Sequence, residues 1–277
     1  MPSKRELIRA RAARAKFKPK APKNVAPPQL PKVAEAAYVK ALKGLVAKIG
    51  KATQEAFGPS IAKYAASQRS DAAGDIITGS TLDRLRARIE AIVSESAVTG
   101  IVSEALNGTN RKNLAEMSRV LGIAPEALIP GMGDVMDAWR EANVNLISSI
   151  GGEYLDQVQE MVATATTEGI RAEALAKALQ ERLGVAESRA ELIARDQVLK
   201  ANAQLSAERM RRVGVTKYKW STSRDSRVRP GHAALEGEII PFDQPPIVDP
   251  KTGRRAHAGE DFQCRCVRIA QWDDEDE

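Results

Sequence analysis

The chain has 277 residues, of which 43% are hydrophobic and 28% are charged, so it is long enough for one large globular domain or two modest ones. Aromatic residues make up only 4% of the chain, which favours packed helices over a β-sandwich. No run of about 18 apolar residues occurs, and the charged N-terminus lacks the apolar segment of a signal peptide. We therefore expect no membrane span, and synthesis in the cytoplasm.

The net charge of +6 is distributed unevenly. Residues 1–32 contain ten Lys and Arg against one acid, Glu6, whereas residues 273–277 are all acidic. Such ends are typical of interaction segments or of solubilising tails. We predict that 1–32 is a basic, Pro-rich flexible arm that binds DNA or an acidic partner through counterion release, or else a solvated leader. The residues expected to make these contacts are Lys4, Arg5, Arg9, Arg11, Arg14, Lys16, Lys18 and Lys20.

Apolar residues recur at helical spacing from about residue 34 to residue 213, with lysines and acids between them. Glycine and proline signals are expected to divide this region, at Gly58-Pro59, Asn107-Gly108, Gly151-Gly152 and Gly184. The predicted helices are 34–57, 80–106, 111–121, 134–150, 153–168, 171–183 and 187–212.

The pattern changes after Gly214, which is suited to end the last helix. Alternating residues predict strands at 216–222, 237–242 and 265–272, with a helical turn at 232–235 and a long loop over 243–262. The predicted fold is mainly α, with an elongated helical region at 33–169 and a small α+β module at 170–272. An acidic tail, 273–277, follows.

The only histidines and cysteines of the chain lie close together in the sequence, at His232, His257, Cys264 and Cys266. Two thiolates and two imidazoles would suit tetrahedral zinc, which could stabilise a small, loop-rich module. The C-x-C spacing is less common in zinc sites than C-x-x-C, and it strains a disulfide. In the alternative, the cysteines pack as small hydrophobes on one face of a strand and His232 bonds a backbone carbonyl.

Three arginines precede His232 in the loop 223–231, and three interpretations of them stay open. Arg227 and Arg229 could pair with Asp225 and Glu236 and hold the loop. They could instead contact DNA phosphates, or they could form a catalytic site with His232 and Asp225. A phosphodiesterase normally needs a metal-binding carboxylate cluster or a pair of histidines, which this loop does not contain.

Several motifs in the C-terminal third occur in a particular order. They are Arg195-Asp196-Gln197, Gly214-Val215 before Trp220, Asp225-Ser226-Arg227-Val228-Arg229-Pro230, His232, Leu235-Glu236-Gly237 and Cys264-Arg265-Cys266. Over about residues 170–272 the chain resembles the Mu F-like phage head morphogenesis proteins, also called minor head or minor capsid proteins. The resemblance implies that Arg195, Asp196, Asp225, Arg227, Arg229, Pro230, His232 and Gly237 are structural motif residues.

One departure from the family concerns the C-x-C motif, which a histidine often precedes closely. Here the neighbouring residues are 260–263, and the nearest histidine is His257. This argues against carrying a metal role over to that upstream position.

The resemblance implies a structural protein of the virion rather than an enzyme. It implies binding at the portal vertex or in the head interior, in several copies, and assistance with head assembly or with DNA packaging, delivery or ejection. The implied partners are the portal protein, the major capsid or scaffolding protein, and phage DNA. Two alternatives stay open: a DNA-binding protein with a zinc-stapled module, and a phage-encoded hydrolase or nuclease that depends on His232.

Overall fold

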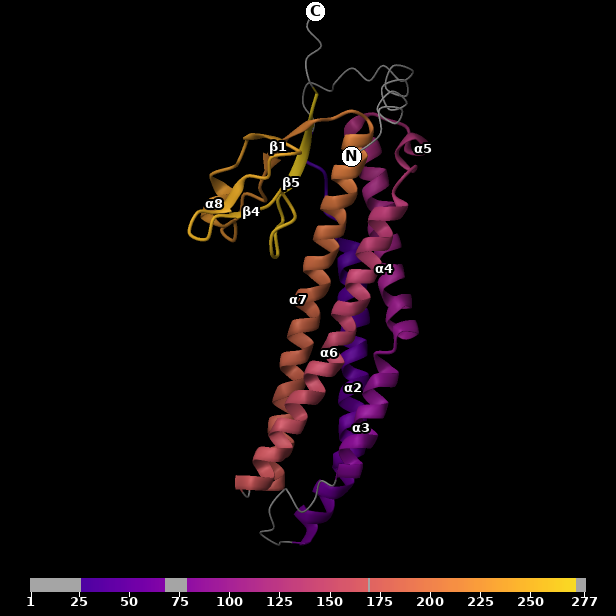
Figure 1. Ribbon diagram of the computed structural model, residues 1–277, viewed down its shortest axis with the longest axis vertical. Helices are drawn as coiled ribbons and strands as arrows, with labels where there is room; N and C mark the ends of the chain where they lie inside the picture. Colours follow the sequence, from indigo (N-terminus) through magenta and orange to yellow (C-terminus); the bar gives the residue numbers. More distant parts are fainter. Residues whose placement is uncertain (1–25, 68–78, 169, 273–277) are drawn as a thin grey trace, which may run out of the picture. The chain divides into compact units, whose positions relative to one another are not determined.

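The structure, a computed structural model, describes residues 26–67, 79–168 and 170–272 (Figure 1). The basic residues expected to bind DNA and the acidic tail lie outside these ranges. The described residues are mostly helical and carry a small antiparallel sheet near the C-terminal end, which confirms the predicted mainly α fold with a small α+β module. None of the described helices combines the length and apolar character that crossing a membrane requires.

Four of the described helices continue through positions where the sequence predicts a stop. Up to Arg212 they are α2 (Lys32–Ser67), α3 (Gly79–Ile92), α4 (Glu95–Leu121), α5 (Pro125–Leu128), α6 (Gly133–Glu168) and α7 (Ala172–Arg212). The predicted stops at Gly58-Pro59, Asn107-Gly108, Gly151-Gly152 and Gly184 are wrong, because all of these residues lie inside helices. A helical glycine costs only about 1 kcal/mol relative to alanine, and packing of the neighbouring apolar residues outweighs that cost.

Gly151 shows why one of these glycines sits within a helix. A Cβ atom at this position of α6 would lie 2.9 Å from side-chain carbons of both Ile89 and Val93. The glycine therefore permits a close approach of α6 to α3 and to the turn that follows it. That turn, at Val93 and Ser94, divides the predicted helix 80–106 into α3 and α4.

Packing divides the described residues into two compact units. Unit 1 contains residues 26–35, Ala105–Trp139 and 195–272, and unit 2 contains Ala36–Glu104 and Arg140–Ala194. These units do not follow the linear order of the predicted domains, because α2, α4, α6 and α7 each contribute residues to both.

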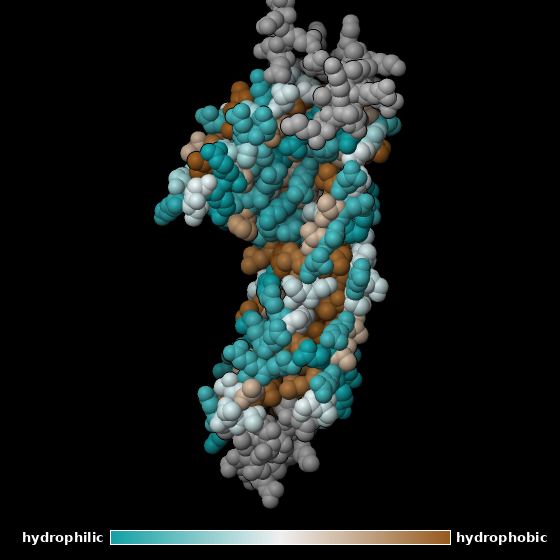
Figure 2. Space-filling view, in the orientation of Figure 1, coloured by the Kyte–Doolittle hydropathy of each residue, from teal (hydrophilic) through white to brown (hydrophobic). Residues whose placement is uncertain are grey.

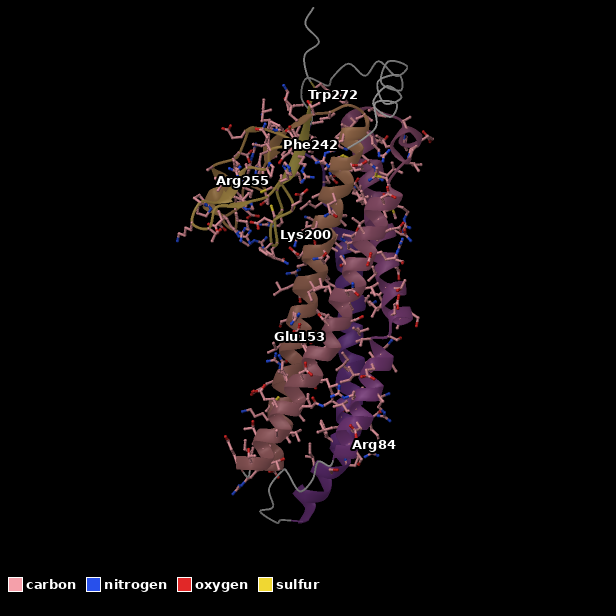
Figure 3. The ribbon with its side chains drawn as sticks, viewed as in Figure 1. Arg84, Glu153, Lys200, Phe242, Arg255 and Trp272 are labelled. Carbon is pink, nitrogen blue, oxygen red and sulfur yellow. The ribbon has the colours of Figure 1, made fainter. Side chains whose placement is uncertain are left out.

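Unit 2 has a core of apolar helix faces. The predicted stripe of the first helix, Tyr38, Leu42, Leu45 and Ile49, is fully buried. Leu85 and Ile89 of α3 and Ile147, Tyr154 and Val158 of α6 are buried as well. Its ion pairs lie nearer the surface, and one of them joins Arg189 to Glu153, which is labelled in Figure 3 with Arg84 of α3.

The C-terminal module of unit 1 contains two small sheets. A three-stranded antiparallel sheet, as predicted, has the order β2-β1-β5, formed by β2 (Ile239–Pro241), β1 (Lys217–Ser221) and β5 (Val267–Gln271). The predicted loop 243–262 is wrong in part, because it contains a second antiparallel sheet of β3 (Ile247–Asp249) and β4 (Arg254–Arg255). The short helix α8 (Pro230–Ala233) matches the expected helical turn within two residues.

The module shares one apolar core with the helix ends beside it. Tyr218, Trp220 and Phe242 pack in the same cluster as Met117 of α4 and Met210 of α7. Figure 1 shows the strands beside the C-terminal part of α7, and Figure 3 labels Phe242 there. The visible face of the module in Figure 2 is mostly hydrophilic. The module therefore depends on α4 and α7 to bury its apolar side.

Candidate metal-binding and structural site

A cluster of three buried donors lies where α8 meets the turn before β5. It consists of His232, Cys264 and Cys266, whose ligand atoms all lie within 4.8 Å of one another. The Nδ1 atom of His232 is 3.4 Å from the sulfur of Cys264 and 3.6 Å from the sulfur of Cys266. The three side chains are almost fully enclosed, with exposed fractions of 3%, 4% and 5%.

The local backbone explains how a C-x-C pair can face one histidine. Gln263, directly before the first cysteine, adopts a φ of 50°, which a non-glycine residue rarely does. The resulting turn brings both sulfurs to the same side before β5 begins at Val267. On the other side of the cluster, Pro230 occupies the first turn of α8, where its fixed φ is favourable, and this helix carries His232.

The other ring nitrogen of His232 is held by a buried carboxylate. Asp261 Oδ2 lies 2.9 Å from His232 Nε2, and its side chain is only 1% exposed. Arg229 donates to the same oxygen at 3.0 Å, and Arg254 donates to it at 3.3 Å. The negative charge of Asp261 is thus compensated by two guanidinium groups, and the carboxylate fixes the orientation of the imidazole.

Phe262, which is 58% exposed, lies beside this arrangement. Arg229 donates to its backbone carbonyl at 2.6 Å. The charged groups of Arg254 and Lys200 lie 5.3 Å and 5.1 Å from the centre of its ring. Lys200, labelled in Figure 3, reaches the ring from α7.

The pKa values of the two cysteines favour a single thiolate, at Cys264, which accepts a hydrogen bond from the Cys266 thiol. The hydrogen bond from Cys266, with that from His232, lowers the pKa of Cys264 to about 5 despite burial. The neighbouring Cys264 raises the pKa of Cys266, and it also raises the pKa of His232 above its ordinary value. Burial opposes ionisation of Asp261, but the Phe262 backbone N–H and His232 hold the pKa of that carboxyl below its usual range.

Trp220 of β1 covers the cluster from the sheet. Its ring stands edge-to-face with that of His232, with centroids 5.7 Å apart. The indole N–H is buried and has no hydrogen-bond partner among the described residues. The neighbouring Cys264 and burial raise the pKa of Cys266, and the indole offsets this rise only in part.

His257, the fourth member of the predicted metal set, lies elsewhere. Its Nδ1 atom is 3.0 Å from the hydroxyl of Tyr218, and the rings of these two residues pack edge-to-face. Burial lowers the pKa of His257 below its ordinary value, which favours a neutral ring. The structure therefore brings together three of the four predicted donors and separates the fourth.

A family model for the Phage Mu protein F like protein matches residues 156–269, which include the whole cluster. This match supports the resemblance of the C-terminal part of the chain to the Mu F-like family. The description of this family refers to protein F of phage Mu.

Two relatives share sequence with the chain, and both are uncharacterized. One, from Haemophilus influenzae, is 36% identical over 191 residues, which are 66% of this chain and 40% of the relative. The other, from Methanocaldococcus jannaschii, is 31% identical over 130 residues, which are 47% of this chain and 19% of the relative. The chain thus spans less than half the length of either. No solved structure matches the chain.

The Mu F-like motif residues of α7 connect this helix to the cysteine turn. Asp196 Oδ1 accepts the backbone N–H of Gln263 at 2.7 Å, and its other oxygen pairs with Lys200 at 2.7 Å. Arg195 lies 3.4 Å from the carboxylate of Glu35 at the start of α2. Both residues of the motif therefore hold segments of unit 1 together.

The loop arginines pair with acids, as in the first of the three interpretations, but two partners differ from those expected. Asp225 pairs chiefly with Arg265, the residue between the cysteines, and more distantly with Arg227 at 3.9 Å. Glu236 accepts from Arg224 at 2.9 Å and from the backbone of Thr222 at 2.6 Å. These contacts close the loop over the end of β1.

Gly237 and Arg229 complete the placement of the predicted motif residues. Gly237 has a φ of 86° and donates its backbone N–H to Trp220 at 2.9 Å, so the tight return from α8 to β2 requires a glycine here. Arg229 pairs with Asp261 rather than with Glu236. The predicted grouping of His232 with Asp225 is not formed, because each has another carboxylate or arginine partner.

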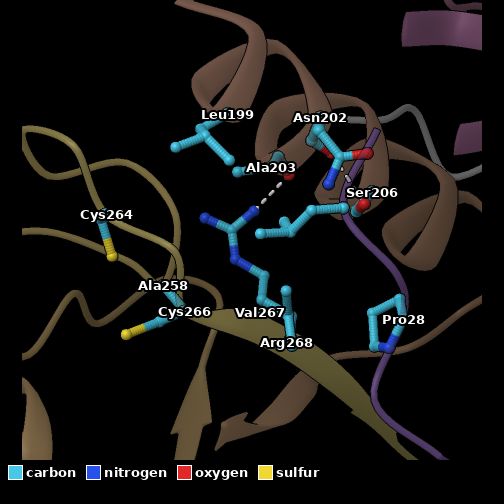
Figure 4. A pocket seen from close by; sticks show the side chains of 11 residues that line it. Pro28, Leu199, Asn202, Ala203, Ser206, Ala258, Cys264, Cys266, Val267 and Arg268 are labelled. Atoms are coloured by element: carbon cyan, nitrogen blue, oxygen red, sulfur yellow. Dashed lines mark hydrogen bonds between the residues drawn. The ribbon is translucent and has the colours of Figure 1, made fainter. Parts of the chain in front are cut away.

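A second polar site, missed by sequence reasoning, joins β5 to α7. Arg268 is 2% exposed, donates to the Ala203 carbonyl and pairs with Glu260. With both cysteines it lines a pocket of about 10 Å³, room for about one water molecule (Figure 4). In β5, Arg268 lies between the apolar residues Val267 and Ile269. This alternation predicts that the arginine faces solvent.

Asp261 is the most important residue that sequence reasoning missed. A signal for it exists, because it stands three residues before Cys264. The spacing could have placed it near the cysteines. Its contact with His232, 29 residues away in the sequence, follows only from the fold.

Proposed function

We propose that this chain is a structural protein of the phage virion, bound at the portal vertex or in the head interior, where it assists head assembly and the packaging or delivery of DNA. The match of residues 156–269 to the Mu F-like family is the observation on which this proposal rests. In this proposal the protein is made in the infected bacterium's cytoplasm and acts in several copies within a larger assembly.

The contacts of the motif residues support a structural role. Asp196, Asp225, Arg229 and His232 each engage another part of unit 1. Enclosure of the His–Cys–Cys cluster also favours a structural use, because a catalytic group must reach its substrate. We therefore propose that the chain catalyses no reaction.

The portal protein is the proposed first partner, and the major capsid or scaffolding protein and phage DNA are further ones. The test is co-expression with the portal protein of the same phage, followed by affinity purification and native mass determination. We expect a complex of fixed stoichiometry with several copies of this chain. Failure to form a complex with portal, capsid or scaffolding protein would contradict the proposal.

A deletion variant shows which part of the chain binds. The deletion removes residues 1–25 only, because the backbone N–H of Gln29 donates to Glu116 at 2.9 Å and belongs to unit 1. We expect the deletion variant to lose DNA binding and to keep the portal complex. This result would mean that the basic residues of 1–25 contact DNA and not the portal protein. If the intact chain instead binds DNA with a steep salt dependence and binds no head protein, the DNA-binding alternative replaces the proposal.

The enzyme alternative has its own test in His232→Ala. It requires a measurable nuclease or hydrolase activity that this substitution abolishes while circular dichroism shows the fold intact. We expect no such activity in the unsubstituted chain. His257→Ala is the matched control, because this histidine is buried in the same module but lies outside the cluster.

A further inference from the structure

We propose that His232, Cys264 and Cys266 bind one Zn²⁺ ion, with Asp261 orienting the histidine from behind. The ion would join α8 to the start of β5. This inference does not depend on the phage-head role, because it concerns how the module is held together.

The distances between the donors suit a tetrahedral ion. Zinc bonds of about 2.3 Å to sulfur and about 2.0 Å to nitrogen, at a tetrahedral angle, separate the two ligand atoms by about 3.5 Å. The two sulfur-to-nitrogen distances are 3.4 Å and 3.6 Å. An ion could therefore bind with little movement of the three side chains.

The surroundings are those of a metal-bound imidazole. A metal-ligating histidine normally donates its second ring N–H to a carboxylate or a carbonyl, and Asp261 is that acceptor for His232 Nε2 at 2.9 Å. Arg229 and Arg254 fix the carboxylate in turn. Nδ1 is left as the ligand atom, and it is the atom that faces both sulfurs.

The charge of the site suits a divalent cation. Two thiolates bring two negative charges into a buried place, and Zn²⁺ compensates both. The buried Trp220 indole N–H, which has no hydrogen-bond partner among the described residues, stands beside the His232 ring and would be available to donate to a metal-bound sulfur. The three protein donors leave one tetrahedral position for a water molecule or a donor from another protein.

A competing use of the same atoms is nucleophilic. Cys264, His232 and Asp261 follow the order of a thiol, imidazole and carboxylate triad. A substrate would have to reach Cys264, which is 4% exposed. In addition, a triad gives no role to Cys266, whose sulfur lies almost as close to the same nitrogen as that of Cys264. A metal ion gives a role to His232, Cys264 and Cys266 alike.

The experiment measures metal directly in the full chain, purified without chelator. We expect one zinc per chain by elemental analysis. Replacement by Co²⁺ should give thiolate-to-metal charge-transfer absorption, and X-ray absorption should show two sulfurs and two lighter ligands. Absence of zinc, together with no such absorption on adding Co²⁺ to the reduced chain, would overturn the proposal. An intact mass showing a Cys264–Cys266 disulfide in freshly purified protein would do the same.

Variants assign the ligands. His232→Gln and Cys264→Ser should each abolish stoichiometric zinc, whereas His257→Gln, in the same module, should retain it. Asp261→Asn should weaken zinc affinity about 10- to 100-fold while leaving the ligand set unchanged. Full zinc content in His232→Gln would contradict the assignment.

Thiol modification provides a readout that does not require variants to fold. Iodoacetamide should leave both cysteines of the native holoprotein unmodified, and a chelator should expose them to reaction. Rapid alkylation of Cys264 that a chelator does not change would overturn the proposal in favour of the triad.

Discussion

The interiors of the two compact units differ in the kind of interaction that stabilises them. Among the described residues, the buried polar or charged side chains of unit 2 are Thr53, Thr81 and Asn143. Those of unit 1 are Thr109, Asn113, Glu116, Asn202, Ser206, Arg209, Ser221, His232, His257, Asp261 and Arg268. Six of these residues of unit 1 lie on α4 and α7, and the other five lie in the C-terminal module. The helices of unit 2 mainly bury apolar stripes against one another, whereas unit 1 must also satisfy buried polar and charged groups.

Arg209 shows how unit 1 uses a buried charge. It donates to the side chains of Asn113 and Asn110 and to the carbonyl of Leu128 at 3.3 Å, and burial lowers its pKa to about 10. Asn113 in turn donates to Ser206 at 2.7 Å. This network joins α4, α5 and α7, and the same Asn113 amide also lies within hydrogen-bond distance of Asn202. Unit 2, by contrast, should tolerate many apolar exchanges of similar volume.

The largest effect should come from Arg268→Met. This change preserves volume but leaves Glu260 and the Ala203 carbonyl without their buried partner. We expect the free energy of unfolding to fall by about 3 kcal/mol, which denaturant titration would measure. In the matched control, Arg189→Met breaks the half-exposed pair with Glu153 in unit 2 and should cost less than about 1 kcal/mol. Equal costs would remove the contrast between the units.

Asp196→Ala should have the next largest effect. It removes the acceptor of the Gln263 N–H and the partner of Lys200, both near the cysteine turn. We expect a loss of about 1.5–3 kcal/mol, because the hydrogen bonds involve a charged group. Hydrogen exchange should show faster amide exchange in the turn before β5. Asp156→Ala, at an exposed position of α6, should change stability by less than about 0.5 kcal/mol.

Two neighbouring glycines of α6 test the packing of unit 2. Gly151→Ala should destabilise by about 1–2 kcal/mol, because the added Cβ would lie 2.9 Å from carbons of Ile89 and Val93. Gly152→Ala meets nothing within 4 Å and should stabilise the helix by about 0.5–1 kcal/mol. Thermal unfolding of both variants would measure the difference in sign. A stabilising Gly151→Ala would show that α6 does not need the close approach.

The smallest effect concerns pH. The Arg265 guanidinium, with the Arg227 backbone N–H, lowers the pKa of Asp225 from 3.8 to about 2. The contribution of this pair to stability is therefore fully present above about pH 4 and is lost as the pH falls towards 2. Asp225→Asn should be slightly less stable than the unsubstituted chain at pH 5, and the difference should shrink steadily on acidification. A difference that stays constant between these pH values would show that the ion pair contributes nothing.

Local patterns in the sequence determined the helical character, the apolar stripe from Tyr38 to Ile49 and the three-stranded sheet. Each depends on short-range periodicity or on a family motif. The helix ends at Gly58, Gly108, Gly151 and Gly184 could not be placed in this way, because a glycine signals a possible break and tertiary packing decides whether one forms.

Tertiary structure alone decided which donors meet. His232 and His257 are equivalent in the sequence, yet the fold pairs one with two cysteines and Asp261 and the other with Tyr218. Long-range contacts also selected Arg265 rather than Arg227 as the main partner of Asp225, and they buried Arg268 against α7. Local propensity and spacing act over a few residues, whereas these contacts join side chains about 30 to 65 residues apart and therefore depend on how the strands return to α7.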